Sequence, residues 1–176
     1  MKRILPAIII ILALAVVALN YVRLSMGERI DSWVTSNETF QVRIDQRAER
    51  FQIPVVGAYY VFRSSAVGSD KWAEVMTFRH DDPVPIPREQ VHFLNDRVGY
   101  VFMGWKYAVT IDGGVSWRTW TAEKDLPNWQ CCNYGLIKDV RLEANGTGVM
   151  ILNPIPLRNG EVPSLHTDDY GQHWKL

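Results

Sequence analysis

The stretch Gly99–Trp120, GYVFMGWKYAVTIDGGVSWRTW, predicts two β-strands joined by a tight turn. Large apolar side chains at Tyr107 and Val109 alternate with smaller or polar ones, which is the period of a half-buried strand. The turn signal is the segment 112–114, Asp-Gly-Gly. Glycine adopts positive φ at little cost, and an aspartate side chain can hydrogen-bond its own turn. Because the alternation resumes from Trp117, an antiparallel hairpin is expected here.

A motif within this stretch occurs a second time near the end of the chain. Its pattern is Thr-x-Asp-x-Gly-x-x-Trp, and the defined positions are Thr110, Asp112, Gly114 and Trp117 in the first copy and Thr167, Asp169, Gly171 and Trp174 in the second. Upstream landmarks recur as well, since Val91 and Val140 lie 49 positions apart, as do Gly99 and Gly148. The sequence therefore predicts repeats at residues 91–121 and 140–176, a period typical of propeller blades or stacked hairpins.

The two copies resemble the Asp-box, or BNR repeat, S/T-x-D-x-G-x-x-W, of sialidases and other β-propeller proteins, including the photosystem II assembly factor family. The resemblance implies an all-β fold in which each aspartate caps its own turn and each tryptophan packs between neighbouring hairpins, away from an active site. A closed propeller usually takes about four to eight blades, whereas this chain has two clear copies and a decayed third over residues 65–72. Antiparallel Asp-box hairpin units in a partial propeller or a small β-sandwich are therefore expected.

The sialidase side of this resemblance is incomplete. Sialidases carry a Phe/Tyr-Arg-Ile-Pro motif whose arginine helps hold the substrate carboxylate, and the corresponding segment here, 51–54, has Gln52 at the arginine position. A neutral amide cannot replace a bidentate guanidinium, which argues against hydrolysis of sialic acid. A glycosidase would also need a pair of carboxylates, and no motif contains the candidates Glu74, Glu89, Glu123, Asp125 and Glu161.

The amino-terminal segment Ile4–Val22 carries no charged residue and is long enough to cross a bilayer as a helix. Lys2 and Arg3 precede it, which slightly favours a cytoplasmic amino terminus and an extracytoplasmic β domain. A cleaved signal peptide is the alternative, with a small-residue cleavage pattern over 13–15. The expected organisation is an anchor (or uncleaved signal) over residues 1–22, a stalk over 23–39 and an exported β domain over 40–176.

The charge composition argues against a nucleic acid as the partner. Lys plus Arg and Asp plus Glu both number 19, so the chain lacks the basic excess typical of a nucleic-acid binder. Neither a metal nor a cofactor is expected. The group of residues most like a metal site lacks a recognised ligand spacing; it contains His166, Asp168, Asp169 and His173. No catalytic residue is assigned.

The cysteines Cys131 and Cys132 are adjacent and are the only two in the chain. Outside the cytoplasm thiols tend to oxidise, so three states stay open: unpaired thiols, a vicinal disulfide, or a bridge to another chain. Trp129 and Tyr134 flank the pair and make this segment a candidate binding loop.

Two or three hairpin units leave sheet edges unpaired, and proteins usually cover such edges. The sequence therefore predicts a non-enzymatic, membrane-anchored extracytoplasmic protein that acts in binding, in assembly or as an accessory subunit through protein–protein contacts. A periplasmic immunity-type inhibitor is a close alternative. A glycan-binding or sialidase-like glycan-processing domain is the other, and an open cleft lined by Trp105, Trp129 and carboxylates would favour it.

Overall fold

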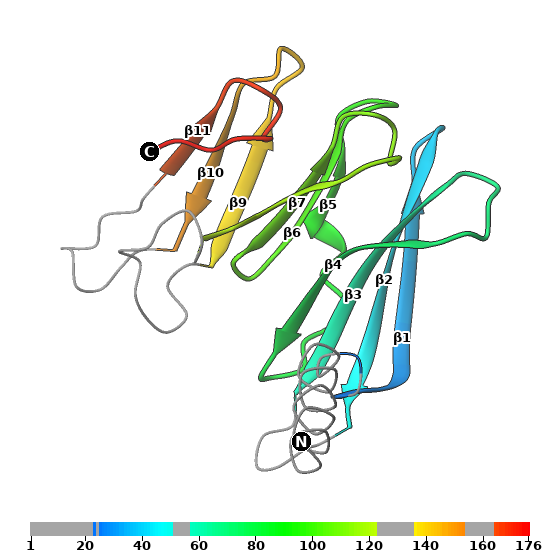
Figure 1. The fold of residues 1–176 in the computed structure, drawn as a ribbon. Helices are drawn as coiled ribbons and strands as arrows, with labels where there is room; N and C mark the ends of the chain where they lie inside the picture. The colour runs from blue at the N-terminus through cyan, green and yellow to red at the C-terminus, as the bar shows by residue number, and fades with distance from the viewer. Residues whose placement is uncertain (1–22, 24, 51–56, 123–135, 154–163) are drawn as a thin grey trace, which may run out of the picture.

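The computed structural model is all-β and antiparallel (Figure 1). It describes residues 23, 25–50, 57–122, 136–153 and 164–176. Within these ranges the chain forms three sheets that follow one another along the sequence. The prediction of an antiparallel all-β domain is confirmed.

Each sheet is a meander in which consecutive strands are hydrogen-bonded neighbours. The first sheet contains β1 (Met26–Ser36), β2 (Phe40–Glu49), β3 (Ala58–Ala66) and β4 (Ala73–His80). A proline-rich linker and the 3-10 helix η1 (Arg88–Gln90) lead to the second sheet, with β5 (Val91–Phe93), β6 (Gly99–Met103), β7 (Lys106–Thr110) and β8 (Arg118–Thr121). The third contains β9 (Ile137–Leu142), β10 (Gly148–Leu152) and β11 (Ser164–Thr167), and a bridge from His166 to Lys175 extends it.

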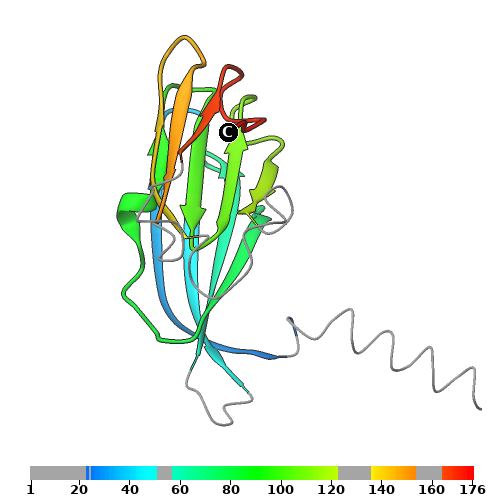
Figure 2. The same ribbon diagram turned by 90° about the vertical axis from the view of Figure 1, so that its left-hand side faces the viewer.

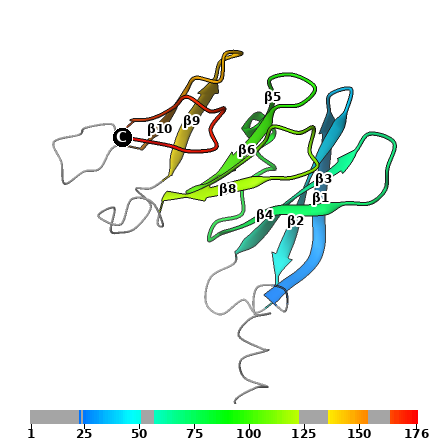
Figure 3. The same cartoon turned by 45° about the horizontal axis from the view of Figure 1, so that its top comes forward.

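The second sheet lies between the other two (Figures 1 and 3). Both faces of its central strands are buried, because side chains on opposite faces of β6 and β7 join two separate hydrophobic cores. The first core, shared with the first sheet, contains Val101, Met103 and Ala108; the second, shared with the third sheet, contains Tyr100, Phe102, Tyr107 and Val109. The strands run mainly along the long axis of the molecule (Figure 2). Because the second sheet shares one core with each of the other sheets, the three form one continuous stack.

Hydrogen bonds also cross between sheets. The Lys106 ammonium donates to the Thr77 carbonyl at 2.6 Å, which joins β7 to β4. The buried Tyr100 hydroxyl donates to the Val140 carbonyl at 2.9 Å, which joins β6 to β9. Burial also raises the pKa of Tyr100 to about 12, so this hydroxyl keeps its proton and remains a donor throughout the neutral range.

Residues 26–36 form a strand of the first sheet, where the sequence predicted part of a stalk. β1 pairs with β2 along its length: Met26 lies opposite Glu49 at one end and Ser36 opposite Gln41 at the other, with irregular register near Arg29. Trp33 packs on the first core, whereas most other β1 side chains are exposed. An edge strand exposes one side of its backbone and one face to water, so its composition resembles that of a polar spacer.

The predicted anchor, Ile4–Val22, lies outside the described residues. Across the ranges that the structure does describe, no helix is long and apolar enough to span a membrane.

Trp33→Ala tests whether β1 is part of the folded domain. Because the indole packs on the first core and is only partly buried, we expect the free energy of unfolding to fall by about 2–3 kcal/mol, less than the ~3–5 kcal/mol for a fully buried tryptophan. The neighbouring Val34 is 47% exposed, so Val34→Ala is the matched control, with an expected change within about 0.5 kcal/mol. Urea unfolding in detergent measures both. Equal, negligible effects would indicate a stalk.

Candidate functional site

The first box loop, residues 110–117, joins β7 to β8 and is held by its own polar side chains. The Thr110 hydroxyl donates to Asp112 Oδ1 at 2.8 Å and accepts from the Gly114 N–H at 2.9 Å. The Asp112 carboxylate also accepts from the Ser116 N–H at 2.9 Å and from the Ser116 hydroxyl at 2.5 Å. Asp112 is thereby committed to bonds within its own turn.

The second box loop, residues 167–174, repeats this geometry. Thr167 Oγ1 donates to Asp169 Oδ1 at 2.8 Å and accepts from the Gly171 N–H at 3.0 Å. His173 takes the place of the serine: its N–H donates to Asp169 Oδ1 at 3.0 Å, and its Nδ1 lies 2.5 Å from Oδ2. Since an ionised carboxylate only accepts, Nδ1 carries the hydrogen in this contact.

These bonds keep both carboxylates ionised. Burial alone would raise the pKa of Asp169, but the His173 ring, the His173 N–H and the Thr167 hydroxyl outweigh burial and lower the pKa to about 2. Burial also acts to raise the pKa of Asp112. Hydrogen bonds from the Ser116 hydroxyl, the Ser116 N–H and the Thr110 hydroxyl outweigh it and lower the pKa of this carboxyl group. A carboxylate that accepts several hydrogen bonds within its own loop is poorly suited to be a general acid.

Each box loop also contacts the sheet that precedes it. The Trp117 ring lies edge-on to Phe40 of β2, with 6.1 Å between ring centroids. The Trp174 ring lies edge-on to Tyr107 of β7 at 5.5 Å. Each indole therefore packs between two neighbouring sheets.

The box glycines allow these aromatic rings to approach. A Cβ atom on Gly114 would lie 2.9 Å from Phe40, and one on Gly171 would overlap the Tyr107 hydroxyl. Both glycines also have positive φ, +81° and +77°, which other residues rarely adopt. Glycine is thus required twice, by the backbone and by the ring.

The loop over residues 65–72 occupies the corresponding place between β3 and β4, without the carboxylate. The Ser65 hydroxyl has the Ser69 carbonyl 3.2 Å away as an acceptor, and Val67 at the aspartate position is 48% exposed. Trp72 stacks on the guanidinium of Arg43, 4.4 Å from the ring centroid. This third loop therefore presents its indole to an arginine, where the other two present theirs to a preceding sheet.

A second threefold recurrence was missed at the sequence level. The first turn of each sheet contains an asparagine whose side-chain oxygen accepts a backbone N–H two residues later: Asn37, Asn95 and Asn145. The Asn37 amide also donates to the Asn95 carbonyl at 2.9 Å, which links the first two sheets. In the sequence, each asparagine stands three or four residues before the first residue of the second strand of its sheet, which is Phe40, Gly99 or Gly148. Because this spacing differs by one residue among the three sheets, a fixed-spacing motif does not detect it.

Most of the other residues singled out from the sequence lie outside the part of the chain that the structure describes. Cys131, Cys132, Trp129, Tyr134 and Gln52 lie outside the described residues, as do Glu123, Asp125 and Glu161. Glu74 accepts from the Thr77 hydroxyl at 2.9 Å, and Glu89 lies in η1. Among the described residues, no group of histidine, cysteine, aspartate or glutamate is placed to hold a metal ion.

A cavity of about 430 Å³ lies under the proline-rich linker. Its lining includes Val84, Ile86, Met103 and Ile137, together with Gln90. The Gln90 side-chain oxygen is buried and has no hydrogen-bond partner in the part of the chain that the structure describes. Its lining also includes Leu136 and Asn153, which adjoin segments outside the described residues. The cavity is therefore a weaker candidate for a binding site than the outer face of the first sheet, which carries several charged side chains.

The strongest candidate is this face of the first sheet, which points away from the stack. Along β2, Phe40, Val42 and Ile44 join the first core, so the alternate side chains Arg43 and Asp45 point to the opposite face. Sequence reasoning did not single out these charges, because neighbouring strands supply the rest of the cluster.

Asp45 is the centre of this cluster and its side chain is only 1% exposed. It accepts from the Ser32 hydroxyl of β1 at 2.8 Å and from the Arg63 guanidinium of β3. Arg43 Nε lies 3.2 Å from Oδ1 as an ion pair without hydrogen-bond alignment, and Arg29 Nη1 lies at 3.6 Å. Three guanidiniums therefore share one buried carboxylate.

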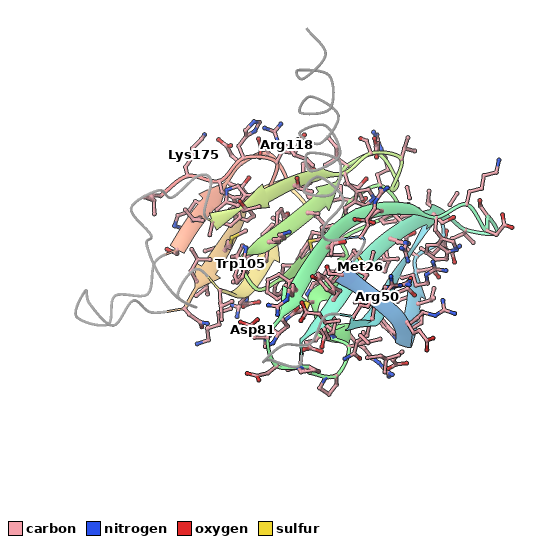
Figure 4. The ribbon with its side chains drawn as sticks, turned by 60° about the horizontal axis from the view of Figure 1, so that its bottom comes forward. Met26, Arg50, Asp81, Trp105, Arg118 and Lys175 are labelled. Carbon is pink, nitrogen blue, oxygen red and sulfur yellow. The ribbon has the colours of Figure 1, made fainter. Side chains whose placement is uncertain are left out.

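Arg47 lies beside this cluster, since it pairs in register with Arg29. Its Nε donates to the Gly27 carbonyl at 3.1 Å, so its charge is not neutralised there. We call the surface formed by Arg29, Arg43, Arg47 and Arg63 around Asp45 the basic face. Met26 and Arg50, labelled in Figure 4, lie at the end of the first sheet where β1 begins.

Compared with protein-family models, with curated proteins and with solved structures, the chain matches none. The geometry of the described residues is therefore the basis for assigning a function.

Gly171→Ala tests the close approach of Tyr107 to the second box loop. The positive φ alone should cost roughly 1–2 kcal/mol, and displacement of the Tyr107 ring should add about 1–3 kcal/mol. Gly68 has nearly the same φ, +79°, and no atom lies within 4 Å of the position that a Cβ would take there. Gly68→Ala is therefore the control for backbone strain, measured by urea unfolding. Equal losses in the two variants would contradict a tight sheet-to-loop contact.

Asp169→Asn tests the charge in the second box loop. The folded pKa, about 2, lies below the unfolded value of 3.8, so the stability from this carboxylate is present above pH ~3.8 and is lost as pH falls toward 2. We expect the variant to be about 2 kcal/mol less stable at pH 7, and the difference from wild type to shrink toward zero near pH 2.

Unfolding of both proteins across this pH range measures the effect. Asp168→Asn is the control, because the Asp168 side chain is 73% exposed and a change within about 0.5 kcal/mol is expected. A difference between Asp169→Asn and wild type that stays constant with pH would contradict the role given to the charge.

Proposed function

We propose that this chain is a non-enzymatic binding protein, held at the outer side of a membrane by residues 1–22, whose sheets form an incomplete Asp-box propeller. It acts through contacts with a protein partner, as an assembly factor, an accessory subunit or an immunity-type inhibitor. Both clear box loops commit their carboxylates to their own turns, which supports a scaffolding role for these motifs rather than a catalytic one.

The observation that carries the proposal is the open stack. The second sheet has a neighbouring sheet on each face, whereas the described parts of the first and third sheets each have one. In the third sheet, Val149 and Ile151 of β10 alternate with the core residues Met150 and Leu152 and are only partly buried. A full propeller would cover such faces with further blades, so here a partner is the expected cover.

A photo-crosslinking amino acid tests this in cells that produce the full chain. We would introduce it separately at Val34 on the outer side of the first sheet and at Val149 on the third. Val115, which is 86% exposed in the first box loop, is the control position.

We expect one discrete protein adduct from Val34 or Val149 and none from Val115. Adducts of equal yield at all three positions would indicate random collisions and contradict the proposal. So would the absence of any protein adduct at the two faces, or hydrolysis of glycosides by the purified chain, which would favour the glycan-processing alternative.

A further inference from the structure

We propose that the basic face docks an acidic segment of a partner protein, whose carboxylates pair with the guanidiniums around Asp45. The inference rests on the proposed binding function and names the chemistry of the partner.

Among the described residues, the four arginines of the basic face outnumber the carboxylates that they contact. Arg29, Arg43 and Arg63 share the carboxylate of Asp45, and Arg47 donates to the neutral carbonyl of Gly27. Glu74 pairs in register with Arg63 from β4, but its carboxylate accepts from Thr77. Glu49 lies on the same side of β2 but is engaged by Arg79. With Asp45 and Glu74 counted, the four arginines still leave an excess of positive charge.

Two of the four arginines are held in place before any ligand arrives. Asp45 fixes Arg43 and Arg63, whose side chains are 21% and 23% exposed, and Trp72 stacks under the Arg43 guanidinium. Each guanidinium has five N–H donors in a planar fork, and Asp45 can engage only part of this set. Fixed donors bind at a lower entropic cost than mobile ones.

The geometry of a guanidinium matches a carboxylate through two parallel hydrogen bonds. An anionic lipid or free phosphate would offer similar chemistry, so the apolar neighbours decide between them. Val34 pairs in register with Arg43, so it lies on the same face, and it is 47% exposed. Arginine and tryptophan are both enriched at the centre of protein interfaces, which favours an acidic protein segment.

The experiment measures binding of a fluorescent oligo-glutamate peptide to the full chain in neutral detergent, by anisotropy. The test variant is Arg29→Gln with Arg47→Gln. Arg29 is 54% exposed and the farthest of the three from Asp45, so Ser32, Arg43 and Arg63 still satisfy that carboxylate. The matched control is Arg97→Gln with Arg118→Gln, two exposed arginines, one between β5 and β6 and one on β8; Arg118 is labelled in Figure 4.

We expect the test variant to bind oligo-glutamate about tenfold more weakly than wild type, and the control variant to bind as wild type does. Wild-type binding should also weaken as salt rises. Unchanged urea unfolding of the test variant would show that the loss is not a folding defect. A test variant that unfolds early is replaced by Arg47→Gln alone, for which a loss of about threefold is expected.

Three results would overturn the inference: equal binding by wild type and the test variant, equal loss in the control variant, or competition by inorganic phosphate as strong as that by oligo-glutamate at equal charge. Vesicles of phosphatidylglycerol that need the same arginines, when oligo-glutamate does not bind, would assign the face to lipid instead. Crosslinks from Val34 with no dependence on these arginines would leave the proposed function standing and remove only the acidic partner.

Discussion

Burial of both faces of the second sheet is the constraint on which the stack depends. β6 is buried along its whole length, which is possible only if the side chains on both faces of the strand pack into a hydrophobic core. The first sheet supplies one core and the third supplies the other. Because apolar burial is the main favourable term in folding, neither contact can be lost without exposing a sheet face, and the three sheets stabilise one another as a series.

The box loops set how closely neighbouring sheets approach. In each of the two clear loops, a carboxylate holds the backbone, a glycine leaves room for an aromatic ring, and an indole fills the adjoining space. The contacting ring comes from the preceding sheet, Phe40 in one case and Tyr107 in the other. A local motif thereby connects two neighbouring sheets, and its aspartate makes its hydrogen bonds within that loop.

In the described part of the chain, the outer face of the first sheet and that of the third sheet differ in chemistry. The first sheet ends in guanidiniums gathered on Asp45, and the third ends in a milder surface where Val149 and Ile151 lie beside the Asp139–Arg141 ion pair. A buried carboxylate without partners would be costly, so at least one arginine is explained by Asp45 itself. The surplus arginines need another reason, and the acidic partner that we propose would supply it.

The sequence by itself determined the strand period, the box turns and the repeat, and the second sheet begins and ends at the residues expected for the first repeat, Val91 and Thr121. These features depend on backbone preferences within a few residues, so a local pattern is sufficient to predict them. Only the tertiary structure decided that polar residues 26–36 join a sheet, and that Arg29, Arg43 and Arg63 converge on Asp45. Those residues come from three strands, and strand pairing, which brings them together, depends on contacts between segments far apart in the chain.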